Sequence, residues 1–428
     1  MRIHFVGCLG VSMRSLMELE RSRLNIVTGS DANLSGHKKE NVHGADLVVY
    51  TCAVGEDNVE LMEARRLGIP TVERARLLGQ LAATYPSVTA IAGAHGKTTT
   101  TAMTAAAMQS LSPTVHIGGD LNPLSKEVRP LHTDKCEHFI TEACEYRRSF
   151  LELKPTLGAV LNVDLDHTDY YRDFDDVLSA FDSFAKRCKT LLVNSDDRAS
   201  MYLNNGGAKY TFGLNALAYF KGENLRCESG NSYSFDLKIG GRRAARVHTC
   251  QPGFHNVYNA LCAVSAAVLN GVDPIAAAKS LKMYGGVKRR FERVGLMCGA
   301  AVVSDYAHHP KEIRATLLNA KKCARGKVYA VFQPHTYTRT LSLQDEFAKA
   351  LKEADDVVLM PIFPAREKPI EGVTSHNIVL KMIRDGRKAA YIDTFCDVLK
   401  YLKNRVTEKD IVIFLGAGDV DKLARSCK

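Results

Sequence analysis

The stretch Val88-Thr-Ala-Ile-Ala-Gly-Ala-His-Gly-Lys-Thr98 decides how the middle of this chain folds. Residues 88–92 are mostly apolar and predict a buried strand, while an alanine- and threonine-rich run to about Ser110 predicts a helix. Between them, Gly93 and Gly96 indicate a tight turn. A strand, a glycine turn and a helix in this order are typical of loops that bind phosphate groups.

This turn predicts a nucleotide site. Glycines let backbone N–H groups face phosphate oxygens, and the helix N-terminus adds the positive end of its dipole. Lys97 is placed to reach the terminal phosphates, and Thr98 offers a hydroxyl to Mg²⁺. The full consensus has glycine at position 91, where this chain has Ile91, so a turn without ligand is the alternative. The expected nucleotide contacts are Gly93, Ala94, His95, Gly96, Lys97, Thr98 and Thr99.

Two carboxylates follow the short strand predicted at residues 139–141. Glu142 and Glu145 come directly after it, at the sheet edge where ligands of parallel sheets bind. Glu142 is therefore a candidate ligand of a Mg²⁺ ion that bridges the nucleotide phosphates. A solvated turn is the alternative interpretation.

A second acidic cluster follows the strand predicted at residues 159–162. It contains Asp164, Asp166, His167 and Asp169, a density that favours a second cation site. The alternative is an acidic helix N-terminus, where aspartate is electrostatically favoured.

Composition limits the classes of protein to consider. The chain has 428 residues, of which 46% are hydrophobic and 24% charged, as in globular enzymes rather than disordered or fibrous chains. The net charge of +10 is spread along the chain, which argues against nucleic acid as a partner. Twelve cysteines without a Cys-x-x-Cys pair, no secretory signal and no apolar run near 18 residues predict a cytoplasmic protein that does not enter membranes.

The pattern of strands and helices predicts an α/β fold of three domains. Residues 1–86 show repeated strand-helix units and are expected to form a Rossmann-like domain. Residues 87–294 are expected to form a central ATPase-like domain around a mostly parallel sheet, with β-hairpins near residues 209–243. Residues 295–428 again alternate strands and helices and predict a second Rossmann-like domain.

Five sequence blocks, in order along the chain, resemble those of the Mur ligase family. The last block, together with residues 332–340 and 416–419, resembles the branch of the family that adds alanine. The resemblance covers nearly the whole chain. The five blocks are residues 93–101, 142–151, 162–171, 255–260 and 304–310.

The resemblance implies roles around ATP. Lys97 would contact the β- and γ-phosphates, Thr98 and Glu142 one Mg²⁺, and His167 a second Mg²⁺. The other nucleotide contacts that it implies are Asn256 and Asn259 at the adenine, Arg290 at the phosphates and Asp305 at the ribose.

The resemblance also implies two sets of substrate contacts. One set would surround the incoming amino acid or the reactive carboxyl group. Its guanidinium is suited to pair with a carboxylate. For its imidazoles, the alternative interpretation is an ordinary surface loop without a ligand. The other set would bind a UDP-sugar, although Leu9 stands in that turn where the family has a glycine. In the phosphate loop, Ala94 stands where the family has a threonine. The first set is His308, His335 and Arg339, and the second is Gly7, Gly10, Ser12, Ser30 and Asp31.

The implied reaction joins L-alanine to the carboxylate of UDP-N-acetylmuramate through an acyl phosphate, in peptidoglycan precursor synthesis. ATP and two Mg²⁺ ions would serve it, with Lys97, Glu142, His167, His308 and Arg339 as the catalytic residues. The alternatives are a related ligase that adds a peptide or another amino acid, a simple phosphotransferase, and a non-catalytic relative that binds nucleotide or UDP-sugar.

Overall fold

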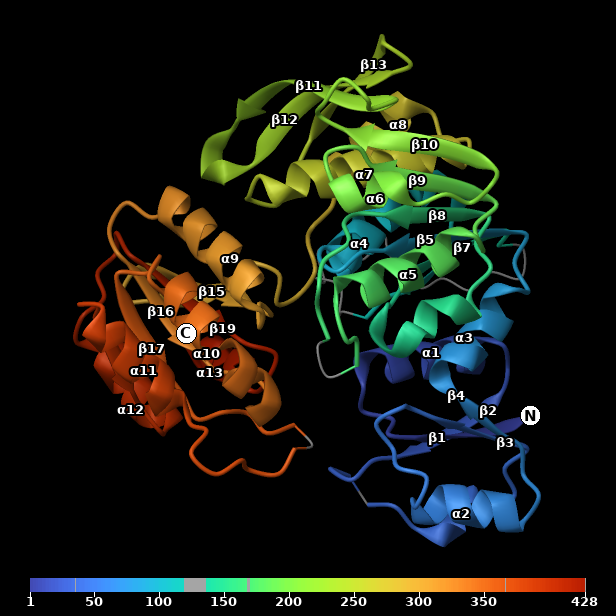
Figure 1. The fold of residues 1–428 in the computed structure, drawn as a ribbon, viewed down its shortest axis with the longest axis horizontal. Helices are drawn as coiled ribbons and strands as arrows, with labels where there is room; N and C mark the ends of the chain where they lie inside the picture. Colours follow the sequence, from blue (N-terminus) through green and yellow to red (C-terminus); the bar gives the residue numbers. More distant parts are fainter. Residues whose placement is uncertain (35, 119–135, 168–169, 366, 428) are drawn as a thin grey trace. The chain divides into compact units, whose positions relative to one another are not determined.

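The computed structural model describes residues 1–34, 36–118, 136–167, 170–365 and 367–427. Within these ranges strands and helices alternate along the chain (Figure 1). The strands form three sheets, in which most neighbouring strands are parallel. The predicted α/β class, with three domains and mostly parallel sheets, is confirmed. No helix in the described ranges has the length and apolar character needed to cross a membrane.

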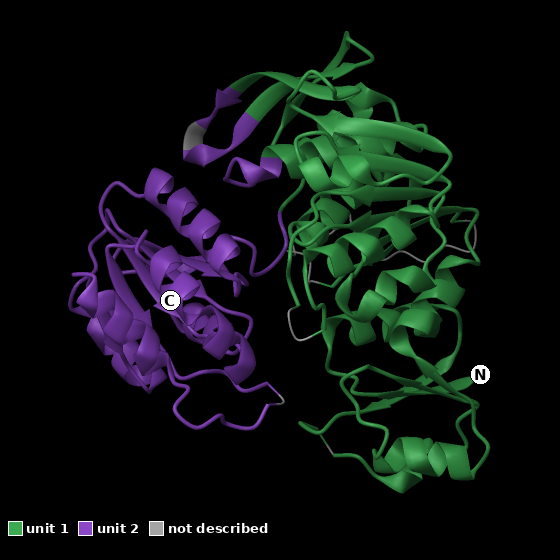
Figure 2. Cartoon of the chain, viewed as in Figure 1, with its two compact units in different colours: residues 1–225, 234–250, 257–285 green, residues 226–233, 251–256, 286–428 purple. Residues whose placement is uncertain are grey.

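Contacts divide the chain into two units, which Figure 2 shows in green and purple. Unit 1 contains the first sheet and most of the second, and unit 2 contains the third. The domain boundaries at residues 86 and 294 stay predictions. Unit 1 comprises residues 1–225, 234–250 and 257–285, and unit 2 comprises residues 226–233, 251–256 and 286–428.

The first sheet of unit 1 has four parallel strands in the order β2-β1-β3-β4. Parallel neighbours need crossover connections, which helices supply here. All four carboxyl ends therefore meet at one edge, where ligands of such sheets bind. The strands are β1 (Arg2–Val6), β2 (Ile26–Ser30), β3 (Leu47–Tyr50) and β4 (Thr71–Glu73), and the α-helices are α1 (Val11–Ser22), α2 (Val59–Arg66) and α3 (Arg74–Ala82).

Glu60, on α2, is a wholly buried carboxylate beneath this edge. Its oxygens accept hydrogen bonds from Ser30 Oγ at 2.6 Å, from Asn41 Nδ2, and, at 2.9 Å, from Nδ1 of His37. Burial opposes the charged form, but hydrogen bonds from His4, Ser30, Asn41 and His37 outweigh burial and lower the pKa of Glu60 to about 2.

The second sheet, most of which lies in unit 1, has nine strands in the order β13-β12-β11-β10-β9-β8-β5-β7-β6. Its strands are β5 (Ser87–Ala92), β6 (Thr114–His116), β7 (His138–Ala143), β8 (Leu157–Val160), β9 (Thr190–Asn194), β10 (Ala208–Gly213), β11 (Phe220–Cys227), β12 (Tyr233–Ile239) and β13 (Arg242–His248). Its α-helices are α4 (Lys97–Ala107), α5 (Phe174–Ala185), α6 (Arg198–Tyr202), α7 (His255–Leu269) and α8 (Pro274–Lys282).

Strand β5 lies between β7 and β8 and is parallel to both. The turn after β5 is therefore flanked by the loops that leave β7 and β8, which carry the two predicted acidic clusters. The apolar cores of the first two sheets merge in one cluster that includes Phe5, Tyr85, Phe139 and Phe181. This shared core fixes the first sheet against the second.

The predicted hairpins near residues 209–243 are only partly correct. Strands β12 and β13 form an antiparallel hairpin, whereas β10 is parallel to both β9 and β11. The loop after β10 leaves the sheet and returns in the same direction. Thr211 stabilises it, because its Oγ1 donates to the carbonyl of Leu217 at 2.7 Å and accepts from the N–H of Tyr219 at 2.9 Å. Turn-forming residues marked the loop correctly but carried no information on strand direction.

The sheet of unit 2 has the order β14-β15-β19-β16-β17-β18, and only the β14–β15 pair is antiparallel. Apolar clusters cover both of its faces, as the near-continuous apolar strands require. The strands are β14 (Glu292–Met297), β15 (Ala300–Asp305), β16 (Val328–Phe332), β17 (Asp356–Leu359), β18 (Ala389–Tyr391) and β19 (Ile411–Leu415). The helices are α9 (Pro310–Cys323), α10 (Tyr337–Leu351), α11 (Ser375–Arg384), α12 (Phe395–Lys403) and α13 (Val420–Ser426).

We expect Glu60→Gln to lower the free energy of unfolding at pH 7 by about 2–3 kcal/mol, because the folded pKa lies well below the unfolded value of 4.5. The contribution is present above pH 4.5 and is lost as the pH falls toward 2, so the difference from wild type should shrink over that window. Urea denaturation followed by circular dichroism measures it. Glu56→Gln, at an exposed position, is the control. A constant difference from pH 7 to pH 3 would contradict the assignment.

Candidate active site

The turn after β5 begins and ends at glycines with left-handed backbone angles. Gly93 has φ of 147° and Gly96, the N-cap of α4, has φ of 86°. A Cβ atom on Gly96 would lie 2.8 Å from Oδ1 of Asn259, and one on Gly93 would lie 3.0 Å from Cβ of Leu161. Only glycine fits these positions without strain. The first N–H groups of α4 have no acceptor within the helix, so a phosphate would bind there.

Asn162, directly after β8, supports this turn through its side-chain amide. Its Oδ1 accepts from the backbone N–H of His95 at 2.9 Å, and its Nδ2 donates to the carbonyl of His95 at 3.1 Å. Its own carbonyl accepts from the N–H of Ala94 at 3.2 Å. Both backbone polar groups of His95 are thus held by the residue that follows a neighbouring strand. The sequence contained Asn162 in a motif, but its role at the turn was missed.

Lys97 makes a buried ion pair with Glu145. The ammonium lies 2.9 and 3.0 Å from the two carboxylate oxygens of Glu145, and it donates to the carbonyls of Gly93 at 2.6 Å and Ala94 at 3.2 Å. Burial opposes the charged form of Lys97, yet the negative charge of Glu145 outweighs burial and raises the lysine pKa. Burial likewise opposes the charged form of Glu145, but Lys97 and His167 outweigh it and lower the pKa of the carboxyl group. Both groups are therefore charged at neutral pH.

Thr98 and Glu142 meet beside this pair. The hydroxyl of Thr98 donates to Oε2 of Glu142 at 3.1 Å, and the N–H of Gly118 donates to Oε1 at 2.6 Å. The first residues of α4 and the end of β7 thus place a hydroxyl and a carboxylate together, the oxygen ligands that Mg²⁺ prefers. The predicted pairing of these two residues is consistent with this geometry.

His167 contributes to a second group of potential cation ligands. Ligand atoms of Glu145, Asp166 and His167 all lie within 4.8 Å of one another. Nε2 of His167 is 3.5 Å from Oε1 of Glu145, and the imidazole packs on Tyr146 with 4.7 Å between ring centroids. The donor set of two carboxylates and one imidazole suits a divalent cation. Asp169, which the sequence grouped with these residues, lies outside the described part of the chain.

The predicted sugar-nucleotide contacts gather at the carboxyl edge of the first sheet. The N–H of Gly7 donates to the carbonyl of Ser30, and the N–H of Leu9 donates to Oδ2 of Asp31 at 3.2 Å. The side chain of Leu9 is 42% exposed, so it points away from the core of the sheet. Gly10 precedes α1 as its N-cap, whereas Ser30 is buried and donates to Glu60.

In unit 2, Asp305 ends β15 and is buried. Its Oδ2 accepts from the N–H of Phe291 at 2.7 Å and its Oδ1 from the N–H of Ala307 at 2.8 Å. Burial raises the pKa of Asp305 to about 6, against the opposing charge of Arg290 and these two N–H groups. Tyr306 packs under Arg290, whose guanidinium lies 5.3 Å from the ring centroid.

Arg289, which no sequence motif identified, also packs against the ring of Tyr306. Its guanidinium is 4.7 Å from the Tyr306 ring centroid and donates to the carbonyls of Gly416 at 2.6 Å and Gly418 at 2.9 Å. These glycines follow β19, the neighbour of β15. Asn256, also in unit 2, donates from Nδ2 to the carbonyl of Pro252 at 2.8 Å.

The imidazoles of His308 and His335 lie at the same edge of the unit 2 sheet, with 6.2 Å between ring centroids. Nδ1 of His308 donates to the carbonyl of Tyr306 at 3.1 Å, which fixes its ring. Burial lowers the pKa of His335 to about 4, so this imidazole is neutral at pH 7. Arg339 lies in the first turn of α10 and opposes the protonation of His335. The three predicted residues of this set are therefore neighbours.

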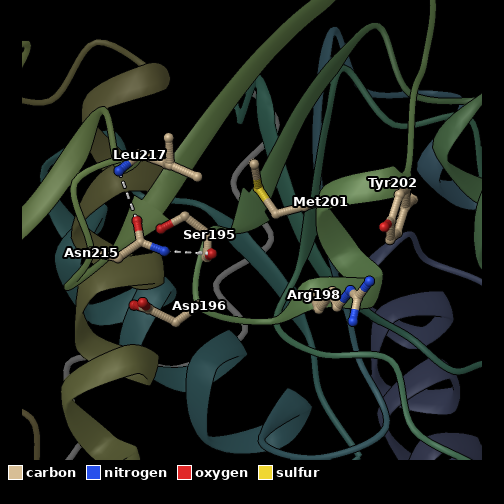
Figure 3. A pocket seen from close by; sticks show the side chains of 7 residues that line it. All are labelled: Ser195, Asp196, Arg198, Met201, Tyr202, Asn215 and Leu217. Carbon is tan, nitrogen blue, oxygen red and sulfur yellow. Dashed lines mark hydrogen bonds between the residues drawn. The ribbon is translucent and has the colours of Figure 1, made fainter.

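An open pocket of about 450 Å³ lies elsewhere in unit 1, beside the loop that follows β9 (Figure 3). Two of its polar side chains bind neighbouring backbone: Asn215 donates to the carbonyl of Ser195 and accepts from the N–H of Leu217, and Asp196 accepts from the N–H of Leu214. No predicted site residue lines it. The lining residues are Ser195, Asp196, Arg198, Met201, Tyr202, Asn215 and Leu217.

Three family models match successive parts of the chain. They are described as "Mur ligase family, catalytic domain" for residues 2–86, "Mur ligase middle domain" for residues 91–267 and "Mur ligase, glutamate ligase domain" for residues 289–418. The chain therefore belongs to the Mur ligase family. It is an ATP-dependent ligase that uses Mg²⁺ and acts on small-molecule substrates.

Curated UDP-N-acetylmuramate–L-alanine ligases are similar to the chain over almost its full length. The protein from Alkaliphilus metalliredigens is 39% identical over 445 residues, which cover 99% of this chain and 96% of the relative. The protein from Acetivibrio thermocellus is 38% identical over 444 residues, which cover 98% and 94%.

Two solved structures are similar in fold. UDP-N-acetylmuramate–alanine ligase from Thermotoga maritima has a TM-score of 0.83 at 28% identity and covers 100% of this chain and 98% of that one. A murein peptide ligase from Psychrobacter arcticus has a TM-score of 0.73 at 22% identity, covers 100% and 98%, and shows likeness of fold alone.

We expect Gly96→Ala to weaken the binding of Mg-ADP at least about tenfold, because the new Cβ would lie 2.8 Å from Asn259 Oδ1 and would move the turn. The positive φ should also cost about 1–2 kcal/mol of stability. Gly68→Ala is the matched control: its φ is 69°, but nothing lies within 4 Å of the new Cβ. Calorimetry measures the binding. Equal affinities in the two variants would refute the role of the turn.

Proposed function

We propose that the protein joins L-alanine to the carboxylate of UDP-N-acetylmuramate at the expense of ATP, in peptidoglycan precursor synthesis. The observation that carries the proposal is the turn of Gly93 to Thr98, with Lys97 and the Thr98–Glu142 pair beside it. The curated alanine ligases at 38–39% identity over nearly the full chain support the choice of substrates.

In the proposed first step a carboxylate oxygen of the sugar nucleotide attacks the γ-phosphorus of ATP. The bond from this phosphorus to the ADP oxygen breaks, which leaves an acyl phosphate and ADP. Both reactants are anions, so the positive charge of Lys97 and the amides of the turn would offset their repulsion. Thr98 and Glu142 would hold one Mg²⁺ and His167 a second, and these ions would screen the phosphate charges.

In the second step the amine of L-alanine attacks the carbonyl carbon of the acyl phosphate. The carbon–oxygen bond to phosphate then breaks and the nitrogen loses a proton, which completes the amide. Arg339 would pair with a carboxylate of the amino acid, and His308 and His335 would line its site. Asn256, Asn259, Arg290 and Asp305 would contact the nucleotide, as the family resemblance implies. The proposed reaction consumes ATP, and the twelve cysteines are free thiols. Both favour a cytoplasmic location.

We expect phosphate release from ATP and UDP-N-acetylmuramate to depend on L-alanine. A coupled assay with L-alanine, glycine, L-serine and a cell-wall tripeptide, each supplied separately, distinguishes the proposal from its rival within the family. Release with the tripeptide and not with L-alanine would identify a peptide-adding ligase instead. ATP turnover without amide formation would identify a phosphotransferase.

We expect Lys97→Met to reduce ADP formation by roughly 100- to 1000-fold, because the methionine fills a similar volume without the charge. Its affinity for the sugar nucleotide should not change, since the ammonium contacts only the turn and Glu145 among the interactions described. Lys154→Met, at an exposed position, controls for the loss of a lysine. Undiminished ADP formation in Lys97→Met would contradict the mechanism.

A further inference from the structure

Arg74 lies at the edge of the first sheet where the sugar nucleotide is proposed to bind. It follows β4 as the first residue of α3, and all four strands of that sheet end at this edge. Its Nη1 donates to the hydroxyl of Ser12, in the first turn of α1, at 2.9 Å. That turn of α1 has no acidic residue, and Gly10 at its N-cap offers no side chain. Arg74 therefore places a guanidinium beside the predicted diphosphate turn, where the carboxylate of Asp31 also lies through its contact with the N–H of Leu9.

A chain of hydrogen bonds continues from Ser12 into the second sheet. Ser12 Oγ lies 3.0 Å from Nε2 of His116, and Nδ1 of His116 lies 3.0 Å from Oγ1 of Thr141. Thr141 Oγ1 donates to the carbonyl of Glu142 at 3.0 Å. His116 on β6 is 2% exposed and Thr141 on β7 is fully buried. The chain therefore joins Arg74 to the backbone of the proposed Mg²⁺ ligand.

Both ends of this chain fix the positions of its hydrogens. A guanidinium only donates, so Ser12 Oγ accepts from Arg74 and gives its own hydrogen to Nε2 of His116. At the other end, Thr141 gives its single hydrogen to a carbonyl and therefore accepts from Nδ1–H of His116. His116 is then a neutral imidazole with its hydrogen on Nδ1. Burial and the charge of Arg74 agree with this, since they lower the pKa of His116 to about 3.

In this arrangement Arg74, rather than the predicted Ser12, is able to donate a hydrogen bond to the substrate. The only hydrogen of the Ser12 hydroxyl is used by His116, so Ser12 has none for a phosphate oxygen. Arg74 has five N–H groups and uses one of them on Ser12. Among the described interactions, Arg74 therefore keeps N–H groups for a ligand, whereas Ser12 keeps none.

We infer that Arg74 binds an anionic oxygen of the sugar nucleotide, and that Ser12 and His116 are positioning residues that hold its guanidinium. The inference rests on the proposed function, because it assumes that a UDP-sugar binds at this edge. The anionic oxygen belongs either to the diphosphate or to the carboxylate that reacts. A guanidinium recognises both, since its planar fork matches two oxygens of either group.

Calorimetric titration of the full chain with UDP-N-acetylmuramate, without ATP, tests the role of Arg74. Arg74→Met should raise the Kd at least about tenfold, as loss of a charged hydrogen bond does, and Arg74→Lys should raise it less. The Kd of Mg-ADP should stay the same in both variants, which shows that they fold. An unchanged Kd for the sugar nucleotide in Arg74→Met overturns the inference. No binding by the wild type would instead refute the proposed function.

Titration with UDP-N-acetylglucosamine distinguishes the two sources of the oxygen, because this sugar nucleotide has the diphosphate but lacks the carboxylate. If Arg74→Met weakens both ligands equally, Arg74 binds the diphosphate. If it weakens only UDP-N-acetylmuramate, Arg74 binds the reactive carboxylate. Either result supports the inference.

The positioning role of Ser12 and His116 has its own test. Ser12→Ala should raise the Kd of UDP-N-acetylmuramate, and Ser12→Thr, which keeps a hydroxyl, should restore it toward the wild-type value. Nitrogen-15 NMR of the histidines should show His116 as the neutral Nδ1–H tautomer from pH 5 to pH 8. The positioning role is overturned if His116 is the Nε2–H tautomer or is protonated. It is also overturned if Ser12→Ala binds UDP-N-acetylmuramate with wild-type affinity.

Discussion

The ion pair between Lys97 and Glu145 is the interaction on which the rest of the proposed nucleotide site depends. A buried charge without a partner is costly, and each of these groups makes the burial of the other acceptable. Glu145 also lies 3.5 Å from His167, and its carbonyl accepts from the hydroxyl of Tyr171 at 2.5 Å. The pair therefore connects the turn after β5 to the loops that leave β7 and β8.

The same pair determines what a triphosphate must displace. An ammonium has three hydrogens, and Lys97 directs them at Glu145 and at the carbonyls of Gly93 and Ala94. Phosphate oxygens must replace one of these acceptors before Lys97 is able to stabilise transferred charge. The negative charge of Glu145 would then be only partly neutralised by Lys97, and the proposed cation beside His167 would neutralise the rest. In the proposed site, metal and nucleotide binding would be coupled through this one carboxylate.

Motifs predicted the contacts that depend on neighbours in the chain or on sheet edges. The strand-turn-helix pattern identified Lys97 and Thr98, and the rule of parallel edges placed Glu142 near them. Contacts between distant positions were missed, because no local pattern encodes them: Asn162 binds the backbone of His95, 67 residues away, and Arg74 binds a hydroxyl 62 residues away. The prediction of a hairpin between β10 and β11 was wrong for the same reason, because the relative direction of two strands depends on how they pair in the sheet.

Residue type alone also leaves the role of a motif residue open. An oxygen is able to accept several hydrogen bonds, whereas each hydrogen is donated to one acceptor. Asp305 accepts two backbone N–H groups, yet a carboxylate has about four acceptor positions, so a ribose hydroxyl would still find one. Ser12 has one hydrogen and it is already used by His116. A polar residue in a motif therefore remains available to a ligand as an acceptor after folding, but as a donor only if the fold has left it a hydrogen.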